Sequence, residues 1–293
     1  MAFLELSVEV AGLNPQQAEA ACFDTGALSV SFTDVLDEPV LEPRPGEMRL
    51  WRRTRLQALY PAAQAQVQLI AQLAAALGVD AGQICARAVA DRVWEREWLR
   101  DFHALRFGRR LWVCPHHESV EEPSAVVVKL DPGLAFGTGT HPSTALCLQW
   151  LDGAALQDWR VVDYGCGSGV LAIAALKLGA REAFAYDIDP QALLATEQNA
   201  AANGVLERLR IVAQVGEIPA GCDLLLANIL ADVLISTGPQ FAPLLRSGGE
   251  CLLAGILAHQ ADEVAAGVGQ WFDMRPYAQR ADWVALAGVR RST

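Results

Sequence analysis

Along the first ninety residues, apolar and polar positions form short runs that predict strands and helices in turn. Residues 28–35 alternate apolar and polar side chains with a period of two, as a half-buried strand does. Three further strand-like segments are residues 3–10, 49–60 and 84–93. Helical runs cover residues 15–27, which open on Pro15, and residues 62–78, which end at Gly78. The order β-α-β-β-α-β predicts a small ferredoxin-like α+β domain over residues 1–90, a fold that by itself indicates no function.

From about residue 125 the pattern changes to apolar runs that alternate with helical stretches. The predicted strands are residues 126–130, 160–163, 183–187, 209–214, 223–228 and 249–257. Nearly continuous apolar runs are typical of parallel strands covered on both faces. Residues 271–278 and 282–288 are expected to close the domain as an antiparallel hairpin. The pattern therefore predicts a doubly wound, Rossmann-like α/β domain over residues 116–293, with ligands bound at the carboxyl ends of its strands.

Residues 91–115 are expected to form a linker helix and connector between the two domains. Trp94, Trp98 and Phe102 recur at intervals of four residues, which places them on one face of a helix. We interpret this stripe as the packing face of the connecting helix rather than as a binding surface.

Composition and charge narrow the possible functions. Apolar residues make up 52% of the 293 residues, enough for a sizeable core, and no run of 18 apolar residues predicts a membrane span. The seven cysteines form no CxxC pair, so we expect a reducing cytoplasm, no disulfide framework and no metal site. Glu5 and Glu9 lie where an export signal would need an apolar run, so we expect no export signal there. The net charge of −11 disfavours nucleic acid and favours a basic partner.

The most informative segment is VVDYGCGSGVLAIAALKLG, residues 161–179, in which a strand, a glycine turn and a helix follow without a gap. Gly165 and Gly167 allow the backbone to approach a ligand, and the helix start offers free N–H groups. A dinucleotide fingerprint would need a glycine where Val170 stands. The tight loop suits a ligand without a pyrophosphate, and Asp163 at the strand end is a candidate partner for a positively charged amino group.

An acidic residue follows this loop at the spacing expected of a nucleoside site. Asp187 ends the next predicted strand 18 residues after Gly169, where a carboxylate accepts hydrogen bonds from ribose hydroxyls. Asp189 precedes Pro190 and is expected to cap the next helix. Together the loop and the acid favour S-adenosylmethionine as the cofactor; a nicotinamide cofactor and a purely structural turn are the alternatives.

A second glycine-rich segment, AFGTGTHPST, spans residues 135–144 and supplies Phe136 as a further candidate cofactor contact. It lacks the lysine of a P-loop, which argues against a triphosphate. Pro142 suits a helix start, so Thr144 is expected in the first helical turn, facing the ligand. An ordinary loop followed by a helix cap is the alternative interpretation.

The third segment is DLLLANIL, which places Asn228 at the tip of a predicted strand. Its carboxamide oxygen can accept a hydrogen bond from an incoming amine and so orient the lone pair for attack. An asparagine that only caps the following helix is the alternative. The residues after Asn228 are aliphatic, without the aromatic ring that holds a flat amide or base in many methyltransferases.

These segments resemble the family of methyltransferases that modify the large-subunit ribosomal protein L11. The resemblance rests on residues 94–115, 130–151, 163–180, 187–192 and 227–231, with shorter likenesses nearer the start. It implies S-adenosylmethionine as cofactor, trimethylation of lysine side chains and of the α-amine, and an N-terminal domain that recognises the protein substrate. The family's cofactor contacts match Thr144, Gly165, Asp187 and Asn228, and Ser143 replaces the family's usual threonine.

The resemblance leaves the proton acceptor open. His141 is the candidate, with a helix-start role as its alternative. Competing functions are a methyltransferase that acts on another protein, a nucleobase or a small molecule, a nicotinamide oxidoreductase, and a sensor that binds S-adenosylmethionine without turnover. We expect a monomer in the cytoplasm, with neither nucleic acid nor a membrane as partner.

Overall fold

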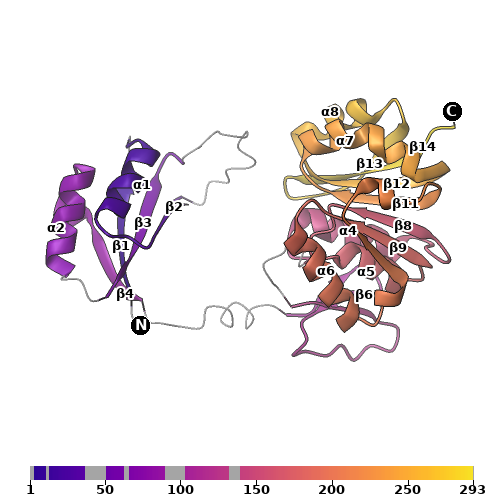
Figure 1. Ribbon diagram of the computed structural model, residues 1–293, viewed down its shortest axis with the longest axis horizontal. Helices are drawn as coiled ribbons and strands as arrows, with labels where there is room; N and C mark the ends of the chain where they lie inside the picture. The colour runs from indigo at the N-terminus through magenta and orange to yellow at the C-terminus, as the bar shows by residue number, and fades with distance from the viewer. Residues whose placement is uncertain are drawn as a thin grey trace. The chain divides into compact units, whose positions relative to one another are not determined.

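The computed structural model describes residues 3–10, 13–36, 51–62, 66–89, 103–131 and 139–292. It divides the chain into two compact units, residues 1–94 and 95–293 (Figure 1). The predicted stripe of Trp94, Trp98 and Phe102 lies outside the described residues. None of the helices described is long and apolar enough to cross a membrane.

The first unit is a four-stranded antiparallel sheet with two helices on one face. Its elements are β1 (Phe3–Val10), α1 (Pro15–Asp24), β2 (Ser29–Asp34), β3 (Thr54–Pro61), α2 (Gln66–Leu77) and β4 (Cys85–Val89). The strand order β2-β3-β1-β4 places β3 between β1 and β2, as in a split βαβ arrangement. Alternate residues of β1 and β3, such as Leu6 and Leu56, are buried against Leu73 of α2. The period-two pattern therefore packs one face of the sheet on the helices.

The second unit is built on a seven-stranded sheet. In spatial order its strands are β10 (Leu209–Val212), β9 (Glu182–Tyr186), β8 (Arg160–Tyr164), β11 (Cys222–Asn228), β12 (Leu245–Leu257), β14 (Trp283–Arg290) and β13 (Phe272–Arg280). The first five are parallel, and β14 is antiparallel to both of its neighbours. This is the predicted doubly wound sheet closed by an antiparallel hairpin.

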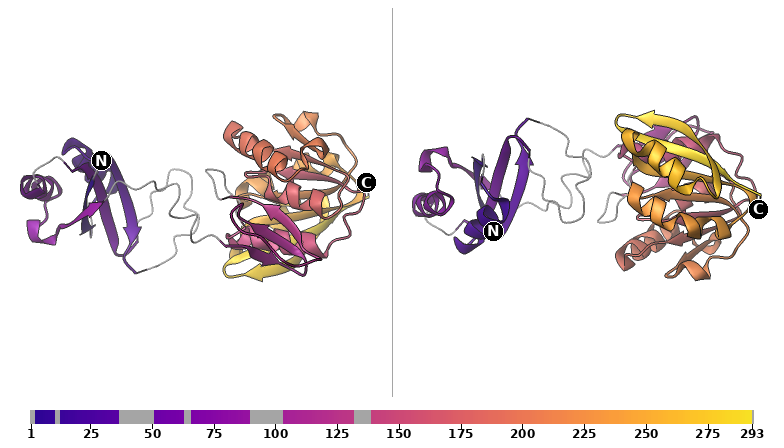
Figure 2. Two further views of the ribbon diagram at one scale, coloured as in Figure 1. Left: turned by 90° about the horizontal axis from the view of Figure 1, so that it is seen from below. Right: turned by 90° about the horizontal axis from the view of Figure 1, so that it is seen from above.

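Helices cover both faces of this sheet (Figure 2). They are α4 (Pro142–Gly153), α5 (Val170–Lys177), α6 (Pro190–Ala202), α7 (Ala231–Leu244) and α8 (Ala261–Val268). Strand β11 shows why its sequence is continuously apolar. Leu224 and Leu226 enter the core that contains α4 and α5, whereas Leu225 and Ala227 enter the core that contains α7 and α8. Both faces of the strand are therefore buried, as in other parallel sheets.

A separate three-stranded sheet precedes the main one and differs from the prediction. Its strands are β5 (Leu105–Phe107), β6 (Leu111–Cys114) and β7 (Val126–Lys129). The sequence pattern assigned the first two to the connector and the third to the main sheet. Their apolar side chains instead join the core around α4 and α5. Buried Asp152 of α4 accepts hydrogen bonds from the backbone N–H groups of Arg109, Arg110 and Leu111, at 2.5, 3.2 and 3.1 Å, and so fixes the β5–β6 turn.

Candidate functional site

The candidate residues gather at the carboxyl ends of three adjacent strands. In the sheet register, Tyr164 of β8 lies between Tyr186 of β9 and Ala227 of β11. The next residues along the three strands are Gly165, Asp187 and Asn228. Residues that are far apart in the sequence therefore lie side by side at one edge of the sheet, which is where ligands bind in this class of fold.

The glycine loop turns tightly between β8 and α5. Gly165, Gly167 and Gly169 have φ values of 77°, 54° and 77°, a region that other residues adopt only with strain. The Gly165 N–H donates to the Tyr186 carbonyl oxygen at 2.8 Å, and the Gly167 N–H donates to Asp187 Oδ2 at 2.9 Å. The loop is thus tied to the end of β9, and Asp187 is held beside the glycine backbone.

Gly165 has no room for a side chain. A Cβ atom built there would lie 2.4 Å from Ile229 Cγ2. Ile229 is held in turn, since its N–H donates to the Ala254 carbonyl oxygen at 3.2 Å and a Cβ atom at Gly255 would meet its carbonyl oxygen. Gly165 therefore lets the segment after β11 pack closely on the glycine loop, and Gly255 lets the same segment pack closely on β12.

Asp163 is a buried carboxylate with one unused oxygen. Its Oδ2 accepts a hydrogen bond from the Ala172 N–H at 2.9 Å, in the first turn of α5, while Oδ1 has no hydrogen-bond partner. Burial raises the pKa of Asp163 to about 7; the Ala172 N–H opposes this increase, and the charge of nearby Asp187 adds to it. A free buried acceptor of this kind is suited to a ligand that carries a donor or a positive charge.

Asn228 has a second buried acceptor. Its Nδ2 donates to the hydroxyl oxygen of Thr144 at 3.1 Å, and its Oδ1 is buried without a partner. Thr144 is fully buried in the first turn of α4, as the position of Pro142 predicted. The hydrogen bond to Thr144 fixes the amide so that its unused oxygen remains available to a donor.

His141 is the N-cap residue of α4. Its Nδ1 accepts a hydrogen bond from the Ser143 N–H at 3.3 Å and lies 2.7 Å from the Ser143 hydroxyl oxygen. The imidazole packs edge-on against Trp283, with 4.5 Å between ring centroids, and burial lowers the pKa of His141. The ring is therefore neutral at pH 7, and one of its nitrogens serves the helix cap.

Two polar residues of α6 also hold the glycine loop, and the sequence analysis missed them. The buried hydroxyl of Thr196 donates to the Gly167 carbonyl oxygen at 3.1 Å, and Asn199 Nδ2 donates to the Ser168 carbonyl oxygen at 2.8 Å. Their spacing of three residues puts both on one face of α6. That spacing was the available signal, although it does not say what the face contacts.

The predictions for Asp189 and Phe136 have different outcomes. Asp189 caps α6, as predicted, because its side chain accepts a hydrogen bond from the Gln191 N–H at 2.8 Å. Phe136 lies outside the described residues. Within the described ranges, no group of three or more His, Cys, Asp or Glu side chains could hold a metal ion.

Comparison with known proteins finds relatives along almost the whole chain. The family model described as "Ribosomal protein L11 methyltransferase (PrmA)" matches residues 2–291. Relatives named ribosomal protein L11 methyltransferase include one from Pseudomonas aeruginosa, 48% identical over 96% of this chain and 97% of its own. Another, from Pectobacterium carotovorum, is 46% identical over the whole of both chains. A crystal structure of the ribosomal protein L11 methylase from Lactobacillus delbrueckii matches with a TM-score of 0.60 and 31% identity, covering 65% of this chain and 100% of that one.

Proposed function

The chain belongs to the ribosomal protein L11 methyltransferase family, and we propose that it transfers methyl groups from S-adenosylmethionine to amino groups of ribosomal protein L11. The targets are lysine side chains and the N-terminal α-amine, and the products are trimethylated. The observation that supports this most directly is the convergence of Gly165, Asp187 and Asn228 at one sheet edge, in a chain matched by the family over almost its full length.

The residues of the site fit such a cofactor. The unused oxygens of Asp163 and Asn228 are buried acceptors without partners, and Gly165 and Gly167 of the glycine loop are partly exposed. In this proposal Asp187 holds the ribose hydroxyls, Gly165 and Gly167 lie along the ligand, and Asp163 pairs with the positive amino group of its methionine part. Thr144 acts through Asn228 by fixing the amide, and Phe136 is a further proposed contact.

When bound, S-adenosylmethionine supplies a methyl group on a positively charged sulfur, and the chain must present a neutral amine to it. A lysine with a pKa of about 10.4 is only about 0.1% neutral at pH 7.4, a cost near 4 kcal/mol, whereas an α-amine with a pKa of about 7.8 costs less than about 1 kcal/mol. A desolvated site lowers the pKa of the incoming amine. The Asn228 carboxamide oxygen accepts a hydrogen bond from the neutral amine and directs its lone pair toward the methyl group.

The proposed proton acceptor is His141. Burial lowers its pKa, so the imidazole is neutral and can accept a proton at pH 7. The same burial makes it a weak base. Because Nδ1 accepts the Ser143 N–H, the neutral ring carries its hydrogen on Nε2, so Nδ1 would take the proton in this proposal and give up its hydrogen bond to the cap of α4.

We propose that residues 1–90 recognise the protein substrate, residues 91–115 connect, and residues 116–293 bind the cofactor in the cytoplasm. The net charge of −11 would assist encounter with a basic ribosomal protein, and neither nucleic acid nor a second copy of the chain is required. A chain lacking residues 1–90 should then bind S-adenosylhomocysteine yet fail to methylate the protein. Full activity of the truncated chain toward L11 would refute this division of roles.

The decisive experiment is methyl transfer from labelled S-adenosylmethionine into a lysate of cells that lack this enzyme. The products are separated into protein, RNA and small molecules, and labelled proteins are identified by mass. Label in L11, in steps of three methyl groups, is the expected result. Label in RNA or in small molecules would refute the substrate assignment, and binding of the cofactor without any transfer would indicate a sensor. The Asn228→Ala variant serves as the matched inactive control.

A further inference from the structure

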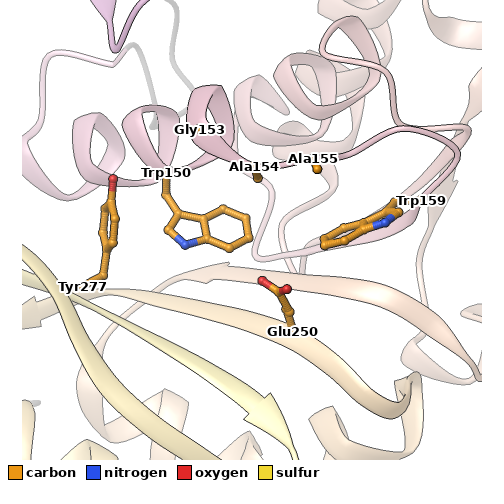
Figure 3. Close-up of a pocket in the computed structure, with 7 residues that line it drawn as sticks. All are labelled: Trp150, Gly153, Ala154, Ala155, Trp159, Glu250 and Tyr277. Atoms are coloured by element: carbon orange, nitrogen blue, oxygen red, sulfur yellow. The ribbon is translucent and has the colours of Figure 1, made fainter.

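A second pocket lies at the end of the sheet opposite the glycine loop. It has a volume of about 310 Å³ and is lined by Trp150, Gly153, Ala154, Ala155, Trp159, Glu250 and Tyr277 (Figure 3). This volume is at the lower end of the range for small-ligand sites, roughly 300–1,000 Å³. The two sites lie at opposite ends of helix α4. Thr144 is in its first turn, while Trp150 and Gly153 are in its last turns. The pocket therefore takes no part in the chemistry proposed above.

Aromatic surface dominates this pocket. Trp150 comes from α4, Trp159 from the residue before β8, and Tyr277 from the edge strand β13. Figure 3 shows the two indole rings on either side of the space above Glu250. Both indoles are half-buried and pack on the core around α4 and α5, which fixes their positions. The faces of aromatic rings, those of tryptophan above all, attract cations.

The charge in the pocket is negative. Glu250 is half-buried on β12, and its carboxyl group points from the strand toward the space between the two indoles (Figure 3). Among the described residues, the Glu250 carboxyl group forms no ion pair or hydrogen bond, and neither lysine nor arginine lines the pocket. The pocket also lies at the carboxyl end of α4, where backbone carbonyl groups carry a partial negative charge. A half-buried carboxylate without a partner is suited to a cation.

We infer that this pocket binds a methylated ammonium group, with Trp150 and Trp159 as its aromatic walls and Glu250 as its counter-ion. Aromatic walls favour a methylated cation over a primary ammonium, because the methyl groups bury apolar surface and the methylated cation is less strongly hydrated. One source of such a group is a methylated protein and another is a free small cation. A methylated protein could be the product of the chain's own reaction. That assignment rests on the proposed function, whereas the binding of a methylated ammonium group does not.

The test is a calorimetric titration of the full chain at low salt with four probes. They are choline, an Nα-acetyl trimethyllysine amide, the same amide with unmethylated lysine, and the neutral isostere of choline in which carbon replaces nitrogen. Saturating S-adenosylhomocysteine is added so that probes do not enter the cofactor site. The two methylated cations should bind at least about fivefold more tightly than the other two probes. A tighter trimethyllysine derivative identifies methylated protein as the source, and tighter choline identifies a free cation.

Variants locate the binding. The Glu250→Gln variant keeps the side-chain volume and removes the charge, so its affinity for both cations should fall about fivefold or more. The Trp159→Phe variant keeps an aromatic ring in this wall but presents a smaller face, so its affinity for both cations should fall in the same direction by a smaller factor. The Glu207→Gln variant removes an equal charge from an exposed position elsewhere in the same unit and should bind as the unaltered chain does.

Equal binding of choline and its neutral isostere would overturn the proposal, as would an unchanged affinity in the Glu250→Gln variant. No methyl transfer takes part in these titrations. Failure of the proposed methyltransferase activity would therefore leave the binding result intact, and failure of binding would leave the activity intact.

Discussion

Replacing Asp163 by Asn separates the stability of the protein from its ability to bind the cofactor. In the ligand-free protein, burial raises the pKa of Asp163 to about 7, against about 3.8 for an ordinary aspartate. The folded protein therefore holds a proton that the unfolded chain has lost between these two values. Because the folded state binds more protons in this range, stability falls as pH rises from about 4 to about 7 and is constant above. An asparagine carries no such charge, and its oxygen can still accept the hydrogen bond from Ala172.

The size of this effect follows from the shift in pKa. A shift of about three units corresponds to roughly 4 kcal/mol in all, at 1.36 kcal/mol per unit. Between about pH 5 and about pH 8.5 the contribution of Asp163 changes by roughly 3 kcal/mol. The Asp163→Asn variant should therefore match the unaltered protein near pH 3, be more stable by about 1–2 kcal/mol near pH 5, and be more stable by about 4 kcal/mol near pH 8.5.

The assay is urea unfolding of both proteins at several pH values, followed by titration with S-adenosylhomocysteine. The variant should lose cofactor affinity while it gains stability at high pH, because Asp163 is proposed to pair with the ligand's amino group. Asp187→Asn is the matched control, since it changes a carboxylate in the same site whose oxygens already accept hydrogen bonds from the Gly167 and Asp189 backbone N–H groups. A stability difference that does not change with pH would refute the argument that Asp163 is protonated in the free protein.

Two further predictions concern the walls of the same site. Replacing Asp187 by Ala should weaken S-adenosylhomocysteine binding by about 1–3 kcal/mol in a calorimetric titration, the scale of hydrogen bonds to a charged group, and an unchanged affinity would place the ribose elsewhere. Replacing Gly165 by Ala should lower the unfolding free energy by about 2–4 kcal/mol, because its φ of 77° strains an alanine by about 1–2 kcal/mol and its Cβ would lie 2.4 Å from Ile229 Cγ2. In a chain that already carries Ile229→Ala, the clash is removed but the backbone strain remains. Gly165→Ala should then lower the unfolding free energy by about 1–2 kcal/mol less than it does when Ile229 is present. An equal loss of unfolding free energy with and without Ile229 would contradict the packing argument.

The sequence predicted correctly where three candidate residues lie in the fold, and their roles stay predictions. Asp163, Asp187 and Asn228 each end an apolar run, and parallel strands bring their carboxyl ends to one edge, so their proximity followed from the fold class alone. The cap at Asp189 followed from Pro190 in the same local way. These inferences needed only a few neighbouring residues and one rule of topology.

The prediction missed the strands β5 and β6, and it placed the correctly predicted strand β7 in the wrong sheet. Runs of three or four residues, such as β5 and β6, are too short for their period to distinguish a strand from a connector. What defines them is a contact distant in the sequence, the acceptance by Asp152 of three backbone N–H groups from the β5–β6 turn. The sequence shows Asp152 near the end of a helical stretch, but it shows neither the burial of this aspartate nor its hydrogen-bond partners.

The unused oxygens of Asp163 and Asn228 show most clearly what sequence cannot supply. Both residues were candidates because of their positions, yet an aspartate or asparagine at a strand end is equally consistent with a cap whose acceptors are all satisfied. The structure distinguishes these cases, because each side chain uses one polar atom in a hydrogen bond within the protein and leaves one oxygen buried without a donor. Leaving two such acceptors unsatisfied costs stability in the free protein, and a ligand with an amino group, or an incoming amine, would remove that cost. The same two residues thus connect the stability of the empty site to the affinity of the occupied one, which is why Asp163→Asn should change both in opposite directions.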